Sequence, residues 1–152
     1  MNVPLNLPPY PYRLSEEKGK QYIYDDFRKK WVVFTPEEWV RQHILHFLVN
    51  KKKYLPGLIA IERKVKHATE QLNRYDVLCY NQTGNPYLLV ECKNPDVPIT
   101  HDTLMQMAHY NMSIKATYVV VSNGLEHYAA RADFNLGELV FLDDFPDFAQ
   151  LT

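Results

Sequence analysis

The sequence predicts an α/β fold in which helices flank a central mixed β-sheet. One helical pattern, three strand patterns, a second helical pattern and a short apolar run follow one another along the chain. Two of the strand patterns are joined by a short turn, and the last strand follows a helix, so antiparallel and parallel neighbours are both expected. The length of 152 residues, with 46% hydrophobic and 23% charged residues, suits one globular domain.

The N-terminal part is predicted to be an extended arm followed by a hairpin. Residues 1–19 form the arm because prolines recur among the first dozen positions. Residues 20–152 form the single domain. Residues 20–24 and 31–34 are two short β segments around the turn Asp25-Asp26-Phe27-Arg28, which predicts a β-hairpin extension.

The first helix has a clear start signal. Thr35 is a capping residue, Pro36 suits the first turn, and Glu38 stands three residues after the cap, as in a capping box. An apolar stripe at helical spacing follows, made by Val40, Ile44, Phe47 and Leu48. Pro56-Gly57 ends this region.

The remaining elements alternate with turn signals. Residues 58–65 predict a strand, and residues 74–78 and 88–93 predict a hairpin around the turn at residues 81–86. Thr100 caps a second helix that runs to about Ser113. The continuously apolar residues 117–122 predict a strand covered on both faces, Asn123-Gly124 a turn, and residues 139–142 a last strand.

Two carboxylates and one ammonium meet on the predicted hairpin. If its turn centres between Thr83 and Gly84, Asp76 lies opposite Glu91, with Cβ atoms ~5 Å apart. Glu91 and Lys93 are two residues apart and share one face of their strand. Like charges placed so close are destabilising unless a cation lies between them. The pattern predicts a divalent-metal site of a phosphodiesterase, whereas a surface hairpin with incidental charges is the alternative.

Four motifs in order resemble a known family. They are Thr35-Pro-Glu-Glu-Trp-Val-Arg41-Gln42, Val90-Glu-Cys-Lys93, Gln106-Met-Ala-His-Tyr110-Asn111 and Ser122-Asn-Gly124. Together with Asp76 they resemble the PD-(D/E)XK nuclease superfamily, and more narrowly the N-terminal nuclease domain of type I restriction enzyme R subunits. The resemblance covers about residues 20–142. One departure is Tyr75, which stands where the superfamily's name has Pro.

The resemblance implies a restriction-endonuclease-like core of order αβββαβ and a Mg²⁺-dependent DNA endonuclease, for which Mn²⁺ can substitute. It leaves open whether the DNA is single- or double-stranded. No Gly-x-x-x-x-Gly-Lys loop occurs, so the ATP-dependent motor of R subunits is not expected. Other restriction or repair subunits, or a second copy, are the expected protein partners. A catalytically inactive nucleic-acid-binding or scaffold module with the same fold is the alternative function.

The resemblance also implies roles for individual residues. Asp76 and Glu91 would bind Mg²⁺, which prefers oxygen ligands. Lys93 would hold or activate the attacking water and offset transition-state charge. Gln106 and Tyr110, one helical turn apart, would lie beside the metal and contact DNA or support the lysine.

An acidic residue of the first helix is also expected near the metal. Glu37 is preferred because it lies on the face of Val40 and Ile44, which we expect to point inward, whereas Glu38 is assigned to the capping box. Either residue can instead simply favour the helix N-terminus electrostatically. Glu62 on the preceding strand is a further candidate for the metal site, but because it is out of phase with Ile59 and Ile61 we expect it to face solvent.

Other kinds of site are not supported. Cys79 and Cys92 are predicted core residues of a reducing compartment, because neither belongs to a Cys-x-x-Cys pair. His43 and His46 lack a third metal ligand and are expected to be solvated. With no secretion signal and no apolar run of ~20 residues, the protein is expected in the cytoplasm, away from membranes.

Overall fold

The computed structural model describes residues 3–64 and 74–148, which form a mixed α/β fold. The elements are β1 (Leu14–Glu17), β2 (Lys20–Asp25), β3 (Lys30–Val33), α1 (Pro36–Lys51), η1 (Pro56–Leu58), β4 (Ile59–Lys64), β5 (Arg74–Tyr80), β6 (Pro86–Cys92), α2 (His101–Ile114), β7 (Tyr118–Ser122), β8 (His127–Asp133) and β9 (Glu138–Leu142). No helix among these residues is long and apolar enough to cross a bilayer.

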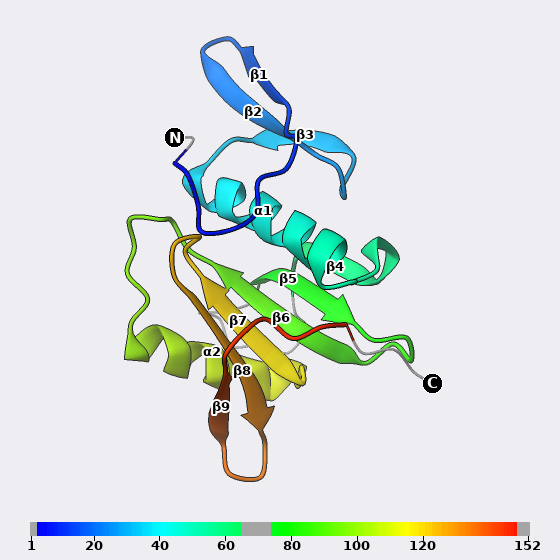
Figure 1. Ribbon diagram of the computed structural model, residues 1–152, viewed down its shortest axis with the longest axis vertical. Coiled ribbons are helices and arrows are strands. Elements are labelled where there is room, and N and C mark those ends of the chain that lie inside the picture. Colours follow the sequence, from blue (N-terminus) through cyan, green and yellow to red (C-terminus); the bar gives the residue numbers. More distant parts are fainter. Residues whose placement is uncertain (1–2, 65–73, 149–152) are drawn as a thin grey trace.

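Strands β4 to β9 form one six-stranded sheet in chain order. Of the neighbouring strand pairs described in this sheet, only β6–β7 is parallel. Helix α2 forms the crossover connection that a parallel pair needs. The two helices cover opposite faces of this sheet (Figure 1). This architecture confirms the predicted α/β class and is consistent with the nuclease-like fold that the resemblance implies.

The alternation of side chains along β6 explains why both helices pack there. Leu88 and Val90 join the core beneath α1, which contributes Ile44, whereas Leu89 joins the core beneath α2, which contributes Met107. All three β6 residues have no exposed surface. The strand is therefore apolar on both faces until Glu91, where the polar site begins.

We expect Ile44→Ala to reduce the free energy of unfolding by about 2–5 kcal/mol, because Ile44 is fully buried between α1 and the sheet and leaves a cavity. Chemical denaturation measures this change. Leu136→Ala is the matched control, since Leu136 is 69% exposed and should change stability by less than about 0.5 kcal/mol. Equal losses in both variants would contradict this account of the core.

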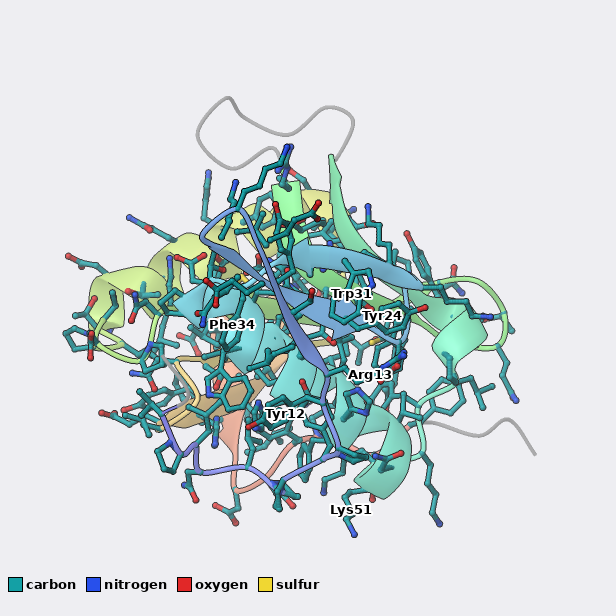
Figure 2. The ribbon with its side chains drawn as sticks, turned by 90° about the horizontal axis from the view of Figure 1, so that it is seen from above. Tyr12, Arg13, Tyr24, Trp31, Phe34 and Lys51 are labelled. Atoms are coloured by element: carbon teal, nitrogen blue, oxygen red, sulfur yellow. The ribbon has the colours of Figure 1, made fainter. Side chains whose placement is uncertain are left out.

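The second sheet is a three-stranded antiparallel meander, β1-β2-β3, that lies over the outer side of α1 (Figures 1 and 2). The predicted hairpin of β2 and β3 is present, but β1 adds a third strand within the segment predicted to be an extended arm. On the meander, the Arg13 guanidinium lies 4.0 Å from the centre of the Tyr24 ring, and Tyr24 contacts Trp31 edge to face (Figure 2).

The first residues of the arm contact both α1 and the turn that follows β7. The Trp39 indole donates to the Val3 carbonyl at 2.7 Å, and the Asn6 amide donates to the Gly124 carbonyl at 2.8 Å. Leu5 fills the space beside Gly124, where an added Cβ would lie 2.7 Å from a Leu5 methyl carbon. The predicted Asn123-Gly124 turn is thus the place where the arm packs.

Most predicted elements are present, with two further differences. Strand β8 was not predicted, because His127–Asp133 mixes polar and small residues instead of alternating clearly. The predicted strand at residues 58–65 begins as the short helix η1, and β4 follows to Lys64. Its last predicted residue, Val65, lies outside the described residues.

Candidate active site

The β5–β6 hairpin has the register that the sequence predicts. Val77 pairs with Val90 and Leu78 with Leu89, and the same register continued by one residue places Asp76 opposite Glu91. The turn closes through the Gly84 amide, which donates to the Asn81 carbonyl at 3.0 Å. Tyr80 pairs with Pro86 at the turn, and the bulge between Cys79 and Tyr80 shifts the register by one residue, which gives the predicted pairing from Cys79 toward Asp76.

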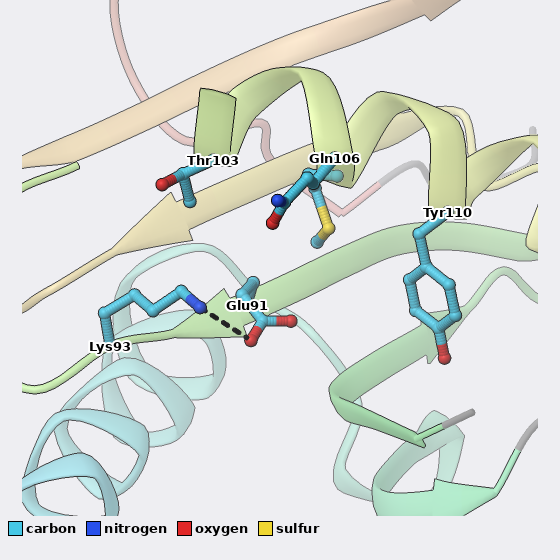
Figure 3. A pocket seen from close by; sticks show the side chains of 6 residues that line it. Glu91, Lys93, Thr103, Gln106 and Tyr110 are labelled. Carbon is cyan, nitrogen blue, oxygen red and sulfur yellow. Dashed lines mark ion pairs between the residues drawn. The ribbon is translucent and has the colours of Figure 1, made fainter. Parts of the chain in front are cut away.

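Glu91 and Lys93 lie on the same face, as predicted, and face α2 (Figure 3). The Lys93 ammonium is 3.7 Å from a Glu91 carboxylate oxygen. Both residues line a small cavity of about 20 Å³ together with α2 residues, among them Thr103 and Gln106. A cavity of that volume has room for about one water-sized group.

The electrostatics of Glu91 are unusual for a carboxyl group. Burial raises the pKa of Glu91 to about 7, and the negative charge of Asp76 adds to the effect, while the Lys93 ammonium opposes it. A hydrogen bond with Asp76 and the charge of Glu37 raise the pKa further. Near neutral pH the Glu91 carboxyl group is therefore present in both its protonated and its ionised form, and such shifted pKa values are common at functional sites.

Asp76 is held at both carboxylate oxygens. Arg41 of α1 donates to Oδ1 at 3.0 Å, and the backbone amide of Cys92 donates to Oδ2 at 2.7 Å. Asp76 thus joins the α1 side of the sheet to Glu91 on the neighbouring strand. The predicted trio of acid, acid and amine is gathered in one place, because the hairpin register brings Asp76 beside Glu91 and the strand period brings Glu91 beside Lys93.

The expectation that Glu37 of α1 points inward is wrong, and Glu38 is the glutamate that is buried. Glu37 is exposed, whereas Glu38 is 6% exposed. The Thr35 hydroxyl accepts from the Glu38 amide at 3.0 Å, so Thr35 is the predicted cap, but the Glu38 carboxylate accepts from Arg28, Arg41 and Gln42. The apolar stripe marks only the side of α1 that faces the main sheet. The meander and the arm cover a second side of α1, which the stripe does not indicate.

An ion-pair network beside Asp76 was not predicted. Glu62 is exposed, as expected, but it also forms ion pairs with Arg41 at 3.1 Å and with Arg28 at 3.2 Å. Its neighbours Ile61 and Arg63 pair with Val77 and Tyr75, the two residues that flank Asp76, so Glu62 lies beside Asp76 across the strands. Glu62 has a φ of 49°, a left-handed conformation that is costly without glycine.

The only sequence signal for this network is the spacing of Glu38 and Arg41, which suits an ion pair on one helix. Arg28 and Glu62 come from a turn and a strand far away in the sequence, and nothing local marks them as contacts.

The expectation of solvated histidines is also wrong. His43 is 6% exposed, and its Nδ1 lies 2.9 Å from the Trp39 carbonyl. The His46 ring stacks on Tyr10 with 3.9 Å between ring centres. Burial lowers the pKa of both imidazoles. They pack α1 against the arm, on the side away from the main sheet.

The two predicted α2 residues both lie at the cavity (Figure 3). Gln106 is exposed at its rim, and Tyr110 is buried. The Tyr110 hydroxyl is enclosed and has no hydrogen-bond partner among the described residues. Burial raises the pKa of Tyr110 to about 12, with the Glu91 charge adding to the effect, so the hydroxyl keeps its proton at neutral pH.

The donor set at this place is compatible with a magnesium ion. Among residues 3–64 and 74–148, no three His, Cys, Asp or Glu side chains gather as for a metal held by protein ligands alone. Mg²⁺ commonly uses one or two carboxylates and completes its shell with waters and substrate phosphate. Asp76 and Glu91 would be those two carboxylates, whereas the exposed Glu37 contributes its charge to the surroundings of Glu91.

Residues 36–146 match the model of a protein family described as the type I restriction enzyme R protein N terminus. The matched range contains Asp76, Glu91, Lys93 and the α2 residues of the cavity. No curated protein matches the chain.

Proposed function

Because the chain belongs to the family of type I restriction enzyme R protein N termini, we propose that it is a Mg²⁺-dependent DNA endonuclease domain of the PD-(D/E)XK type. The observation that carries the proposal is the convergence of Asp76, Glu91 and Lys93 at one end of the β5–β6 hairpin. Stability alone does not favour Glu91 at this position, since burial and the neighbouring charge of Asp76 raise the pKa of its carboxyl group. DNA is the proposed substrate, and other restriction subunits or a second copy are the proposed protein partners.

The positions of the side chains support a proposed role for each. Asp76 and Glu91 would hold Mg²⁺, which when bound would polarise the phosphodiester and lower the pKa of a bound water. The Lys93 ammonium, 3.7 Å from Glu91 and one-third exposed, can reach a water in the cavity and offset negative charge on the reacting phosphate. Gln106 at the rim and Tyr110 inside can donate hydrogen bonds from α2.

The direct test is incubation of the purified protein with plasmid and single-stranded DNA in the presence of Mg²⁺ or Mn²⁺. We expect cleavage that Lys93→Ala lowers by about 10²–10³-fold or more, because the variant removes a charge aimed at the reacting phosphate. Lys30→Ala is the control, as it removes an exposed lysine distant in sequence and on the meander. Cleavage that is equal in the wild type and in Lys93→Ala would refute the assignment.

The inactive scaffold predicts a different result in a metal titration. A nuclease site should bind Mn²⁺ with millimolar or tighter affinity, and the binding should disappear in Asp76→Ala. A scaffold should show no dependence on the metal. Circular dichroism of both proteins establishes that the variant is folded, so lost binding can be assigned to the lost carboxylate.

We expect Tyr110→Phe to lower the cleavage rate while the protein stays folded. Within residues 3–64 and 74–148 the buried hydroxyl has no partner, so its removal should cost the fold little and should even relieve an unpaired polar group. A melting temperature equal to or above that of the wild type, together with slower cleavage, fits a hydroxyl used by the bound substrate or metal. Unchanged cleavage would exclude that role and leave Tyr110 as a core residue.

A further inference from the structure

Arg41 connects three acidic residues at the candidate site, Asp76 among them. Its side chain is 4% exposed and forms ion pairs with Glu38 at 3.0 Å, with Glu62 at 3.1 Å and with Asp76 at 3.0 Å. A buried guanidinium is stable only when it is paired in this way. Because so little of the side chain is exposed, Arg41 is in no position to bind DNA directly.

The contact with Asp76 has a geometric consequence. Arg41 holds Oδ1 and the Cys92 amide holds Oδ2, so the carboxylate has donors at both oxygens and a fixed orientation. A carboxylate has about four lone-pair positions, so both oxygens keep the capacity to bind a cation on the side of Glu91. Active sites need their reacting groups and metal ligands to be held in place within a fraction of an ångström, and a carboxylate with a fixed orientation satisfies this need.

Glu38 of α1 holds the Arg41 guanidinium in place through a second ion pair. Glu38, which pairs with Arg41, also accepts from Arg28 at 2.9 Å and from Gln42 at 3.0 Å. Arg28 pairs with Glu62 as well, but no ion pair with Asp76 is formed by Arg28 among the described residues. The part-buried Arg28, which also pairs with Asp25, thus shares Glu38 and Glu62 with the buried Arg41, and of the two only Arg41 reaches the candidate metal ligand.

We propose that Arg41 is a positioning residue, which fixes the Asp76 carboxylate in the orientation needed for metal binding and cleavage. The inference rests on the proposed nuclease function for its consequence in catalysis, whereas the positioning itself can be tested without metal or DNA. Arg28→Met is the matched control, because it removes an arginine from the same network and leaves the Asp76 contact in place.

The first measurement is the NMR resonance of the Cys92 amide in the metal-free protein. This amide donates to Asp76 Oδ2 at 2.7 Å, so its proton should resonate downfield and should move upfield when the carboxylate rotates away. We expect the upfield shift in Arg41→Met and not in Arg28→Met. An unmoved resonance in Arg41→Met, or an equal shift in both variants, overturns the proposal.

The second measurement is the kinetics of DNA cleavage. We expect Arg41→Met to lower kcat by about 10²-fold with the KM for DNA unchanged, because a misplaced ligand slows the reaction without loosening the DNA. Arg28→Met should stay within about threefold of the wild type, since surrounding structure still holds Asp76. Equal losses of kcat, or a change in KM alone, contradict a positioning role.

Arg41→Lys covers the case in which Arg41→Met does not fold. A lysine keeps the positive charge but has a compact ammonium that cannot bridge three carboxylates as the planar guanidinium does. A smaller shift of the Cys92 amide and a lower kcat at unchanged KM are expected, and wild-type values in both readouts overturn the proposal. If the wild-type protein cleaves no DNA, the proposed function fails, while the NMR comparison still decides the positioning.

Discussion

Replacing Asp76 by Asn should reduce Mg²⁺-dependent DNA cleavage by about 10²–10³-fold or more, the range expected when one electrostatic group of an active site is removed. An amide carries no charge for the metal. It also has one oxygen where Asp76 uses two, so either Arg41 or the Cys92 amide loses its acceptor. The loss should therefore be larger than the loss of a distant surface charge.

The measurement is the rate of plasmid nicking as a function of Mg²⁺ concentration, with circular dichroism to establish folding. Asp96→Asn is the matched control, because it removes the same charge from an exposed loop close in sequence to Lys93. We expect Asp96→Asn to cleave like the wild type. Residual cleavage in Asp76→Asn that is recovered by raising Mg²⁺ would indicate weakened metal binding, and undiminished cleavage at low Mg²⁺ would contradict the assignment.

Replacing Glu91 by Gln should abolish cleavage and at the same time stabilise the fold at pH 8. The pKa of Glu91 is about 7 in the folded protein, raised by burial and by Asp76 from the ordinary value of 4.5. The stability associated with its proton is fully present below pH 4.5 and is lost as the pH rises through 7. At pH 8 the ionised carboxylate therefore costs stability, and an amide of the same shape removes about 1–3 kcal/mol of that cost.

Chemical denaturation at pH 5 and pH 8 measures this effect. The gain in Glu91→Gln should be clear at pH 8 and much smaller at pH 5, where the folded wild type already carries the proton. Glu138→Gln, an exposed carboxylate of β9, should show no such difference. A gain of the same size at both pH values, or a loss of stability at pH 8, would disagree with the raised pKa.

The charged groups around Glu91 explain why this residue would lower stability and yet be needed for cleavage. Arg41 pairs with Asp76, but the charge of Asp76 still opposes ionisation of Glu91, and the Lys93 ammonium beside Glu91 is one-third exposed and screened by solvent. A sequence selected for stability alone would place an apolar or neutral residue at position 91, next to the apolar run of β6.

The sequence by itself determined the parts of the molecule that depend on near neighbours. Thr35 and Pro36 define the start of α1, because capping and a proline at the first turn act within three or four residues. The turn residues around Gly84 predict the hairpin, and the two-residue strand period places Glu91 and Lys93 on one face. The register that brings Asp76 beside Glu91, however, also depends on the bulge between Cys79 and Tyr80.

Only the tertiary structure decided which other groups meet that trio. Glu38 is buried and Glu37 is exposed because the meander and the arm cover the second side of α1, and an apolar stripe carries no information about that cover. Arg41 contacts Asp76 across 35 residues of sequence. Ion pairs over such separations depend on how helix and sheet pack together, so no local pattern of residues predicts them.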